Sequence, residues 1–350
     1  MQRKVRKRPG RVQILGMLLL FIAIALFARH TFIRYQEREA AVQAIKERGQ
    51  KRLEEEAAGI SARTGILEHN GKTYRRNTAV RAILCLGVDT VDEMEKQNVS
   101  GTGGQADSIL LVAQDAAEDT VQIVMIPRDT MTEITLFDYF GNELGKDTRQ
   151  LTLAYAYGDG REKSCQLVSE AVSELLFGLE IDGYFAANMS TIAVFNDEVG
   201  GVPVTIEDPS LAERYPEFTL GDSVLLQGEQ AIRYVRYRDI NESQTAMRRL
   251  ERQKDYLKSF IKTAKQRYHE DEQLIVRLVD DVETYMITDL AKDQYMDMGL
   301  AFLNSPKMME DGDFISVPGE VVETELYEEF YPDMEMLKEI IIRLFYKEGN

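Results

Sequence analysis

The sequence predicts an α/β fold, built as an α+β sandwich in which strands alternate with helices along one large domain. Short apolar runs that end at Gly or Pro alternate with longer segments whose apolar residues recur at helical spacing. Hydrophobic residues make up 44% of the chain and charged residues 29%, which is ordinary for a soluble globular protein. The length of 350 residues fits about two folding units, or one large domain with appendages.

The expected elements begin near residue 65. Asn70-Gly71 predicts a hairpin turn, because this pair favours the positive backbone angles that tight hairpins need. The apolar patterns predict strands at 82–86, 108–113, 121–126, 184–188 and 204–206, and helices at 164–177, 191–199, 245–269, 272–285, 290–304 and 334–347. No internal repeat is evident in the sequence, so residues 65–350 are expected to form one domain.

The first 64 residues predict membrane attachment. Residues 1–11 hold six Lys or Arg and no acid, and an apolar run from Ile14 to Ala28 follows. Residues 12–33 are expected to be an uncleaved transmembrane signal-anchor, with a cleaved signal peptide as the alternative. The basic head at 1–11 then lies in the cytoplasm, and residues 34–64, rich in helix formers, form a helical stalk. We expect a single-pass protein of the cell membrane with an extracytoplasmic domain, where ATP is not normally available.

Charge and composition exclude several classes of function. The net charge is −17, and removing the six positive charges of residues 1–11 leaves −23 for the rest. Such a negative charge argues against binding of duplex nucleic acid, because that binding depends on Lys and Arg side chains that neutralise phosphates. Two cysteines, Cys85 and Cys165, are too few for a disulfide scaffold and are expected to be free thiols. Three scattered histidines give little support to histidine-based metal or triad chemistry.

Three aspartates stand at expected strand ends. Asp89 follows the first strand of the domain, Asp107 precedes the second after a glycine-rich stretch, and Asp129 follows the third. Carboxylates at neighbouring strand ends can converge on one divalent cation with oxygen ligands, Mg²⁺ or Mn²⁺. For any one aspartate taken singly, the ordinary role of ending a strand and capping a turn is the favoured interpretation.

Arginines are concentrated in one short stretch of this acidic chain. Six fall within 20 residues: Arg233, Arg236, Arg238, Arg248, Arg249 and Arg252. An extended backbone over residues 234–238 is expected to point Arg236 and Arg238 the same way, while Arg249 and Arg252 share a face of the following helix. Because guanidinium groups match phosphate oxygens, we expect an anion site, with a solvated surface cluster as the alternative. Acidic metal ligands next to phosphate-binding arginines are typical of enzymes that catalyse phosphoryl transfer.

Eight short motifs then follow one another in an order typical of a single family. They are ILCLGVD (83–89), ADSILLV (106–112), IPRDT (126–130), LAYAYG (153–158), GGV (200–202), LQGEQA (226–231), YVRYR (234–238) and RLERQ (249–253). From residue 82 to 255 the chain resembles the LytR-CpsA-Psr family, whose extracytoplasmic enzymes attach glycopolymers to bacterial peptidoglycan. The resemblance implies a central mixed β-sheet flanked by helices, with an apolar channel that holds a polyprenyl chain.

The reaction that the resemblance implies is a Mg-dependent phosphotransfer. A glycan-1-phosphate moves from an undecaprenyl pyrophosphate carrier to a hydroxyl of peptidoglycan. By position, Asp89 and Asp107 correspond to metal-binding and catalytic aspartates. Asp129 is expected to orient Arg128, and both are assigned to catalysis. The pyrophosphate contacts are expected from Arg128, Arg236, Arg238, Arg249, Arg252 and Gln253.

The chain departs from the family pattern at several positions of the expected site. Gln105 stands where an arginine is usual, and Gln150 aligns with a usual lysine. Thr152 replaces an asparagine, and Ala246 an aspartate. Loss of a partner for a developing phosphate charge can cost roughly 2–4 kcal/mol. Neighbouring Lys146, Arg149 or Arg248 could compensate, and a non-catalytic polyprenyl-phosphate-binding or regulatory module of the cell envelope is the alternative function.

Overall fold

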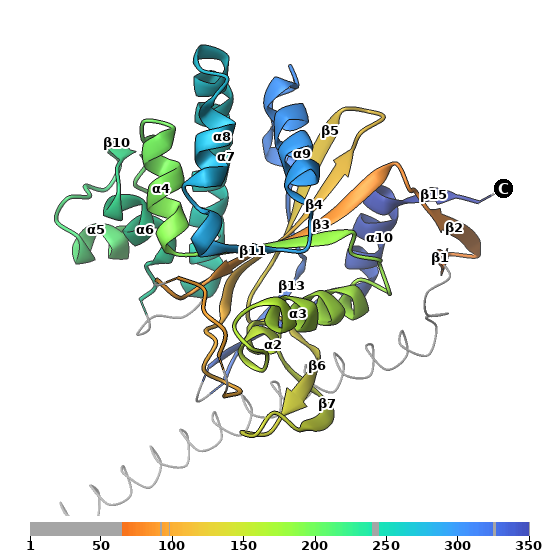
Figure 1. Ribbon diagram of the computed structural model, residues 1–350. Coiled ribbons are helices and arrows are strands. Elements are labelled where there is room, and N and C mark those ends of the chain that lie inside the picture. The colour runs from red at the N-terminus through yellow and green to blue at the C-terminus, as the bar shows by residue number, and fades with distance from the viewer. Residues whose placement is uncertain (1–64, 92, 98, 240–244, 325–326, 350) are drawn as a thin grey trace, which may run out of the picture. The chain divides into compact units, whose positions relative to one another are not determined.

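The computed structural model describes residues 65–91, 93–97, 99–239, 245–324 and 327–349 (Figure 1). All of them belong to the second of two compact units, which spans residues 52–350. The predicted basic head, anchor and stalk at 1–64 lie outside the described residues. Within the described ranges, no helix is both long and apolar enough to cross a bilayer.

A six-stranded mixed sheet forms the centre of the domain, with the strand order β11-β8-β3-β4-β5-β12. β3 pairs parallel with β8 and antiparallel with β4, and β5 pairs antiparallel with β4 and parallel with β12. The predicted central mixed sheet is therefore confirmed. The strand bounds are β3 Val80–Val88, β4 Ala106–Asp115, β5 Thr120–Ile126, β8 Gly183–Asn188, β11 Met286–Thr288 and β12 Phe314–Ser316.

Helices cover both faces of this sheet (Figure 1). One face packs against α2 (Thr152–Ala156), α3 (Glu162–Leu175) and α10 (Met334–Phe345) in the largest hydrophobic cluster. The other face lies under α4 (Ser190–Glu198), α7 (Thr245–Glu270) and α9 (Lys292–Asn304). Because side chains alternate along a strand, Leu84 and Leu111 are fully buried on the first face, whereas Leu110 on the second stays half-buried. The sandwich predicted from the sequence is thus confirmed, with a looser second layer.

Four smaller sheets complete the domain. The predicted turn at Asn70-Gly71 is confirmed, since both residues have positive φ values, 49° and 73°. A hairpin of β6 and β7, which the sequence did not predict, follows β5 in the chain. The bounds are β1 Ile66–His69, β2 Lys72–Arg76, β15 Tyr346–Glu348, β6 Met131–Phe137, β7 Glu143–Gln150, β9 Val202–Thr205, β10 Ser223–Leu226, β13 Gly319–Glu323 and β14 Glu328–Pro332.

The predicted extended backbone at 234–238 is wrong for its first three residues. They lie in α6 (Glu229–Arg236), and α5 (Pro209–Arg214) and α8 (Leu274–Asp280) are the remaining α-helices of the described chain. Ala231, Tyr234 and Val235 are buried, and their spacing of three and four residues is that of a helix face. Helical burial therefore outweighs the alternating pattern of the YVRYR motif.

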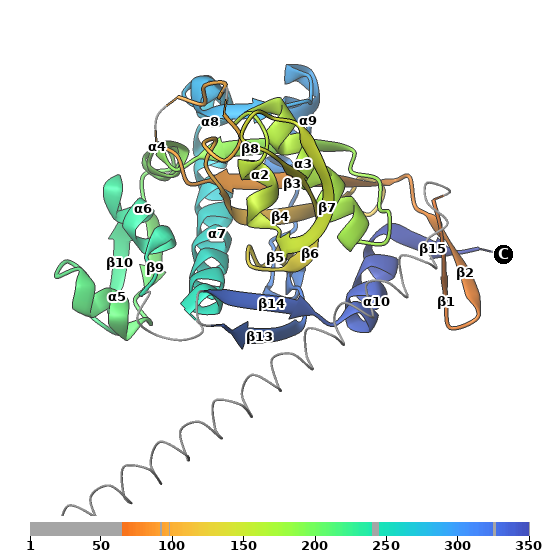
Figure 2. The ribbon, with the colours of Figure 1, turned by 90° about the horizontal axis from the view of Figure 1, so that it is seen from below.

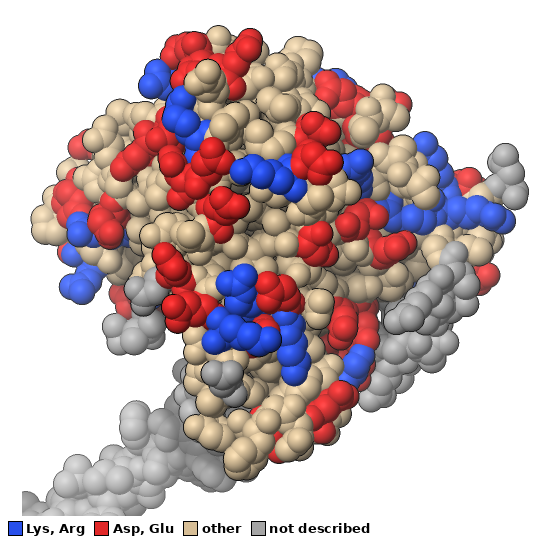
Figure 3. All heavy atoms as spheres, in the orientation of Figure 1, with Lys and Arg blue, Asp and Glu red and all other residues tan. Residues whose placement is uncertain are grey.

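The residues after 270 belong to the same fold. β11 and β12 occupy the two edges of the central sheet, and α10 packs in the main core. Figure 2 shows β14 beside one end of α7, although the two are far apart in the sequence. On the face shown in Figure 3, basic and acidic side chains are interleaved, with a compact basic group over the region of α2 and α3.

Candidate active site

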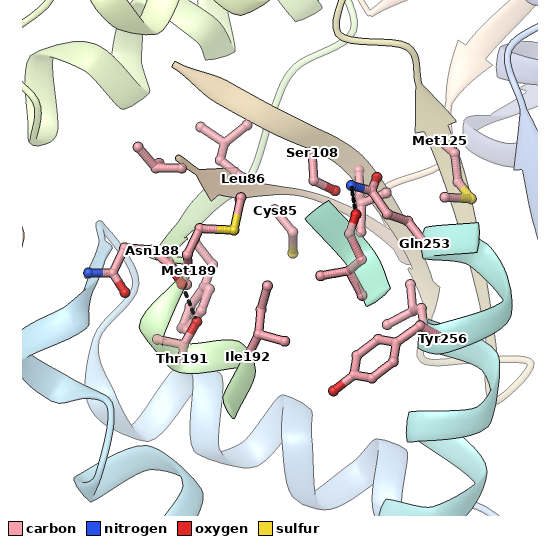
Figure 4. A pocket seen from close by; sticks show the side chains of 17 residues that line it. Cys85, Leu86, Ser108, Met125, Asn188, Met189, Thr191, Ile192, Gln253 and Tyr256 are labelled. Atoms are coloured by element: carbon pink, nitrogen blue, oxygen red, sulfur yellow. Dashed lines mark hydrogen bonds between the residues drawn. The ribbon is translucent and has the colours of Figure 1, made fainter. Parts of the chain in front are cut away.

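An apolar cavity of about 220 Å³ lies between the central sheet and helices α4, α6 and α7. Cys85 from β3, Ile192 from α4 and Tyr256 from α7 point into it (Figure 4). Ser108 and Gln253 supply polar groups at its lining, and the Gln253 side-chain amide donates to the Val235 carbonyl at 3.3 Å. The cavity occupies the second, looser face of the sheet. Such a lining accommodates a hydrocarbon chain.

Asp107 joins two arginines at the edge of this cavity. Its Oδ1 accepts from Nη1 of Arg128, which follows β5, and its Oδ2 accepts from Nη1 of Arg249 on α7 at 3.2 Å. Ser108 is the next residue of β4, and Gln253 lies one turn after Arg249. The cluster of Asp107, Arg128 and Arg249 therefore adjoins the apolar cavity.

Asp129 pairs with Arg128, as the sequence predicts. The Arg128 Nε lies 3.3 Å from Asp129 Oδ1, and the Gln150 side-chain amide donates to the same oxygen at 3.0 Å. That Gln150 amide also donates to the backbone carbonyl of Glu328 at 2.7 Å. Gln150, which replaces an expected cation, thus ties Asp129 to strand β14.

Arg238 is held by a residue that the sequence did not indicate. Its Nη2 donates to Glu328 Oε2 at 2.8 Å, and its Nε donates to the Thr245 hydroxyl at 3.0 Å. Glu328 is a buried carboxylate of β14, 90 residues beyond Arg238 in the chain. No local sequence signal could have found it, because its role depends on where the C-terminal hairpin packs.

Asp89 faces the end of the glycine-rich loop. Its Oδ1 accepts from the Gln105 backbone N–H at 2.7 Å, and the Gln105 carbonyl accepts from the Asp89 N–H at 3.1 Å. The Gln105 side chain in turn accepts from Arg128 Nη2 at 2.6 Å. Gly104 has φ +88°, and a Cβ there would lie 2.9 Å from Asp89 Oδ1. A glycine is therefore required for the loop to approach Asp89 this closely.

Two predicted phosphate contacts lie apart from this network. Arg236 is exposed at the end of α6. Arg252 is buried, and its guanidinium donates to the carbonyls of Tyr234 and Tyr237 and to the carboxylate of Asp208. These contacts link α7 to α6 and to the N-terminus of α5, where Asp208 is also the N-cap.

Burial and mutual repulsion lower the pKa values of two arginines in this cluster. Burial is the largest cause that lowers the pKa of Arg249, to about 10, and the neighbouring Arg238 lowers it further. The pKa of Arg128 is also lowered, first by burial, while Asp129 opposes the change. A phosphate that approached these groups would relieve the repulsion between them.

The residues fit a divalent cation that is shared with a substrate. Asp89 and Asp107 offer hard oxygen ligands at the paired ends of β3 and β4, and the buried Asp129 Oδ2 has no hydrogen-bond partner in the structure. Within the described residues, no group of three or more His, Cys, Asp or Glu could hold a metal alone. Mg²⁺ typically takes one or two carboxylates together with substrate phosphates, which suits this set.

The basic residues next to Gln150 do not replace the expected lysine. The ammonium group of Lys146 pairs with Glu174, and Arg149 pairs with Asp147 at 2.6 Å. Arg248 is exposed on α7. The cysteines meet the expectation, since both Cys85 and Cys165 are free thiols.

Comparison with known proteins places this chain in a family. The LytR_cpsA_psr family model matches residues 35–341. The chain is 27% identical to the polyisoprenyl-teichoic acid–peptidoglycan teichoic acid transferase TagU of Halalkalibacterium halodurans, over 53% of each chain. It is 25% identical to TagU of Bacillus licheniformis, over 67% of this chain and 65% of the relative. The aligned parts thus span about half to two thirds of these relatives.

Solved structures share the fold. Protein gbs0355 from Streptococcus agalactiae superimposes with a TM-score of 0.60 at 21% identity, covering 76% of this chain and 86% of that one. TagT bound to LI-WTA gives a TM-score of 0.56 at 22% identity, covering 76% and 89%. These likenesses show the fold, and the family-model match over most of the length shows that the chain belongs to the LytR-CpsA-Psr family.

Proposed function

We propose that the protein is a membrane-anchored phosphotransferase that moves a glycan-1-phosphate from an undecaprenyl pyrophosphate carrier to a peptidoglycan hydroxyl. The observation that carries this proposal is the apolar cavity, which adjoins a cluster of Asp107, Arg128 and Arg249. A lipid pyrophosphate has the same two halves, a hydrocarbon chain and a compact anion. The relatives named teichoic acid transferases support the same class of reaction.

The proposed chemistry needs charge neutralisation more than covalent participation. Arg128, Arg238 and Arg249 bind the two phosphates, and the apolar cavity holds the first part of the polyprenyl chain. The acceptor oxygen forms a bond to the phosphorus that carries the sugar. At the same time the bond between this phosphorus and the bridging oxygen breaks, and the bridging oxygen leaves as part of the polyprenyl phosphate. No ATP is needed, because the phosphoanhydride is already activated.

Asp89 and Asp107 are proposed to hold Mg²⁺ or Mn²⁺. A bound divalent cation would neutralise charge that develops on the leaving phosphate. Since both oxygens of Asp107 are engaged by guanidinium groups, Arg128 and Arg249 would move to the substrate phosphates as that carboxylate takes the cation. Asp89 is the candidate that accepts the proton of the attacking hydroxyl.

An assay of the full-length protein with a labelled undecaprenyl pyrophosphate saccharide, peptidoglycan acceptor and Mg²⁺ tests this proposal. We expect a labelled product that is lost on adding a chelator and in Asp107→Ala. Arg236→Ala tests the exposed arginine separately, and loss of the product in this variant would support its predicted contact with the pyrophosphate. Tight lipid binding with no transfer, for several glycans, would contradict the enzyme.

The alternative is a non-catalytic polyprenyl-phosphate-binding or regulatory module of the cell envelope. Gln105 and Gln150 favour this alternative, because these neutral side chains make hydrogen bonds within the protein at positions where the family has cations. The nearby cations Lys146 and Arg149 form ion pairs elsewhere. Gln105→Arg discriminates between the two functions. A chain that gains transfer only with this substitution is a binding module in its natural form.

A further inference from the structure

A polar groove of about 490 Å³ lies at the end of β3, and nothing in the proposed chemistry above uses it. The loop between β3 and β4 forms most of its wall, and Gly160 forms the rest. Its polar side chains belong to Thr90, Glu93, Glu95, Gln97 and Thr102. We propose that this groove binds the acceptor saccharide whose hydroxyl attacks the donor phosphate, an inference that rests on the proposed function.

The groove and the apolar cavity lie on opposite faces of the sheet. Met94 lines the groove and belongs to the core cluster on the side of α2 and α3. The apolar cavity lies under α4 and α7. In a displacement at phosphorus, the attacking and leaving oxygens are roughly in line on opposite sides. A lipid phosphate that leaves toward the cavity therefore needs an acceptor that arrives from the groove side.

Asp89 lies between the groove residue Thr90 and the loop that reaches Arg128. A Cβ on Gly104 would lie 2.8 Å from the Thr90 side chain, which lines the groove, and 2.9 Å from Asp89 Oδ1. On its other side the loop reaches Arg128 through the Gln105 side chain. The groove residue Thr90 and the carboxylate of Asp89 therefore flank the same glycine, at the border between the groove and the proposed site.

Close backbone packing holds the wall of the groove in place. A Cβ on Gly103 would come within 2.7 Å of the Gly160 backbone, so the loop touches the segment that precedes α3. The Gly101 N–H donates to the Ala156 carbonyl at 2.7 Å, and the Gln97 N–H donates to the Asp159 carbonyl at 2.7 Å. The groove is therefore built by the fold and is more than a gap beside a loop.

The lining selects a class of ligand. Hydroxyl, amide and carboxylate groups suit a saccharide, which offers many hydroxyl donors and acceptors. Glu93 and Glu95 are exposed carboxylates, whereas the neighbouring cations are engaged: Lys96 lies 3.5 Å from Asp159, and Arg161 donates to the Met94 carbonyl and to Glu162. The two carboxylates disfavour an anionic ligand. We therefore assign the groove to a neutral or amine-bearing saccharide rather than to a second phosphate.

A tryptophan reporter tests binding directly, because the chain contains no tryptophan. Full-length Glu95→Trp protein is titrated with soluble uncrosslinked peptidoglycan strands, and its emission is followed. We expect a saturable change at Glu95→Trp. The matched control, Glu118→Trp, lies in the exposed turn after β4 and should show none.

Kinetics separate the groove from the rest of the reaction. Gln97→Ala should raise the acceptor KM about three- to tenfold, the loss of one hydrogen bond, with donor KM and donor binding unchanged. An unchanged acceptor KM, together with no emission change in a Glu95→Trp protein that still transfers, would overturn the groove assignment alone. A saturable emission change at Glu95→Trp, in a chain whose wild-type form never transfers, would support the groove and overturn the proposed function.

Discussion

Glu328 shows how a single buried carboxylate can govern the site from a distant part of the chain. It accepts from Arg238, and its backbone carbonyl accepts from Gln150, which also holds Asp129. A carboxylate that pairs with a guanidinium contributes about 1.5–3 kcal/mol. Glu328 is therefore a positioning residue for Arg238.

We expect Glu328→Ala to reduce the rate of transfer about 10- to 100-fold, because Arg238 loses the partner that fixes the orientation of its guanidinium group. Glu328→Gln retains an acceptor and should recover part of the rate. The donor KM and kcat are measured for both variants, with the exposed Glu335→Ala as the control. Equal losses in the Ala and Gln variants, together with lowered thermal stability, would point to a purely structural role.

Cys85 gives a prediction about reactivity. Burial raises the pKa of its thiol from 9.0 to about 12. Only on the order of 10⁻⁴ of the thiol is ionised at pH 8, and the thiolate is the reactive form. We expect iodoacetamide to leave Cys85 unmodified in the folded protein and to label it after unfolding, as followed by mass spectrometry. Rapid labelling of the native protein at pH 8 would contradict this environment.

The same shift has a consequence for stability. Because the folded thiol has the higher pKa, its contribution to stability is complete below about pH 9 and is lost as the pH rises toward 12. Cys85→Ala should therefore flatten the decline of unfolding free energy over that range.

At the scale of elements, α7 and α6 are joined through Arg252. Its guanidinium reaches two carbonyls at the end of α6 and the N-cap carboxylate of α5. Removing one partner of a buried ion pair typically costs about 3–5 kcal/mol. This arginine thus holds together the elements that carry Arg236 and Arg249.

We expect Arg252→Ala to lower the unfolding free energy by about 3–5 kcal/mol in denaturant titrations. Lys262→Ala, an exposed position on the same helix, should change it by no more than about 0.5 kcal/mol. A stable Arg252→Ala protein with a raised donor KM would instead support the direct phosphate contact predicted from the RLERQ motif.

The elements also show where the sequence predicted well and where it failed. Strands β3, β4 and β5 were predicted because continuous apolar runs between Gly, Pro and Asp leave little choice. The extended prediction at 234–236 failed because burial of Tyr234 and Val235 against neighbouring helices decides that segment. Hairpin β6–β7 carries many polar residues, so its strands had no apolar pattern to reveal them.

For the whole molecule, the charge distribution limits the partners. The net charge is −17, and basic side chains on the face shown in Figure 3 are interleaved with acidic ones. We expect no shift of duplex DNA at about 0.15 M salt in a mobility assay, because nonspecific binding needs several uncompensated phosphate contacts. Retention of DNA that weakens steeply with salt would contradict this expectation.

The sequence by itself predicted the family, the positions of the main strands along the chain, and the aspartates and arginines of the expected site. These predictions follow from local patterns, because an apolar run or a short motif can be recognised without knowing how the chain packs. Only the tertiary structure decided that Asp107 joins Arg128 to Arg249, that Arg252 faces α6, and that Glu328 completes the cluster. Such contacts link residues from 15 to 142 positions apart, and they depend on how layers pack rather than on any local preference.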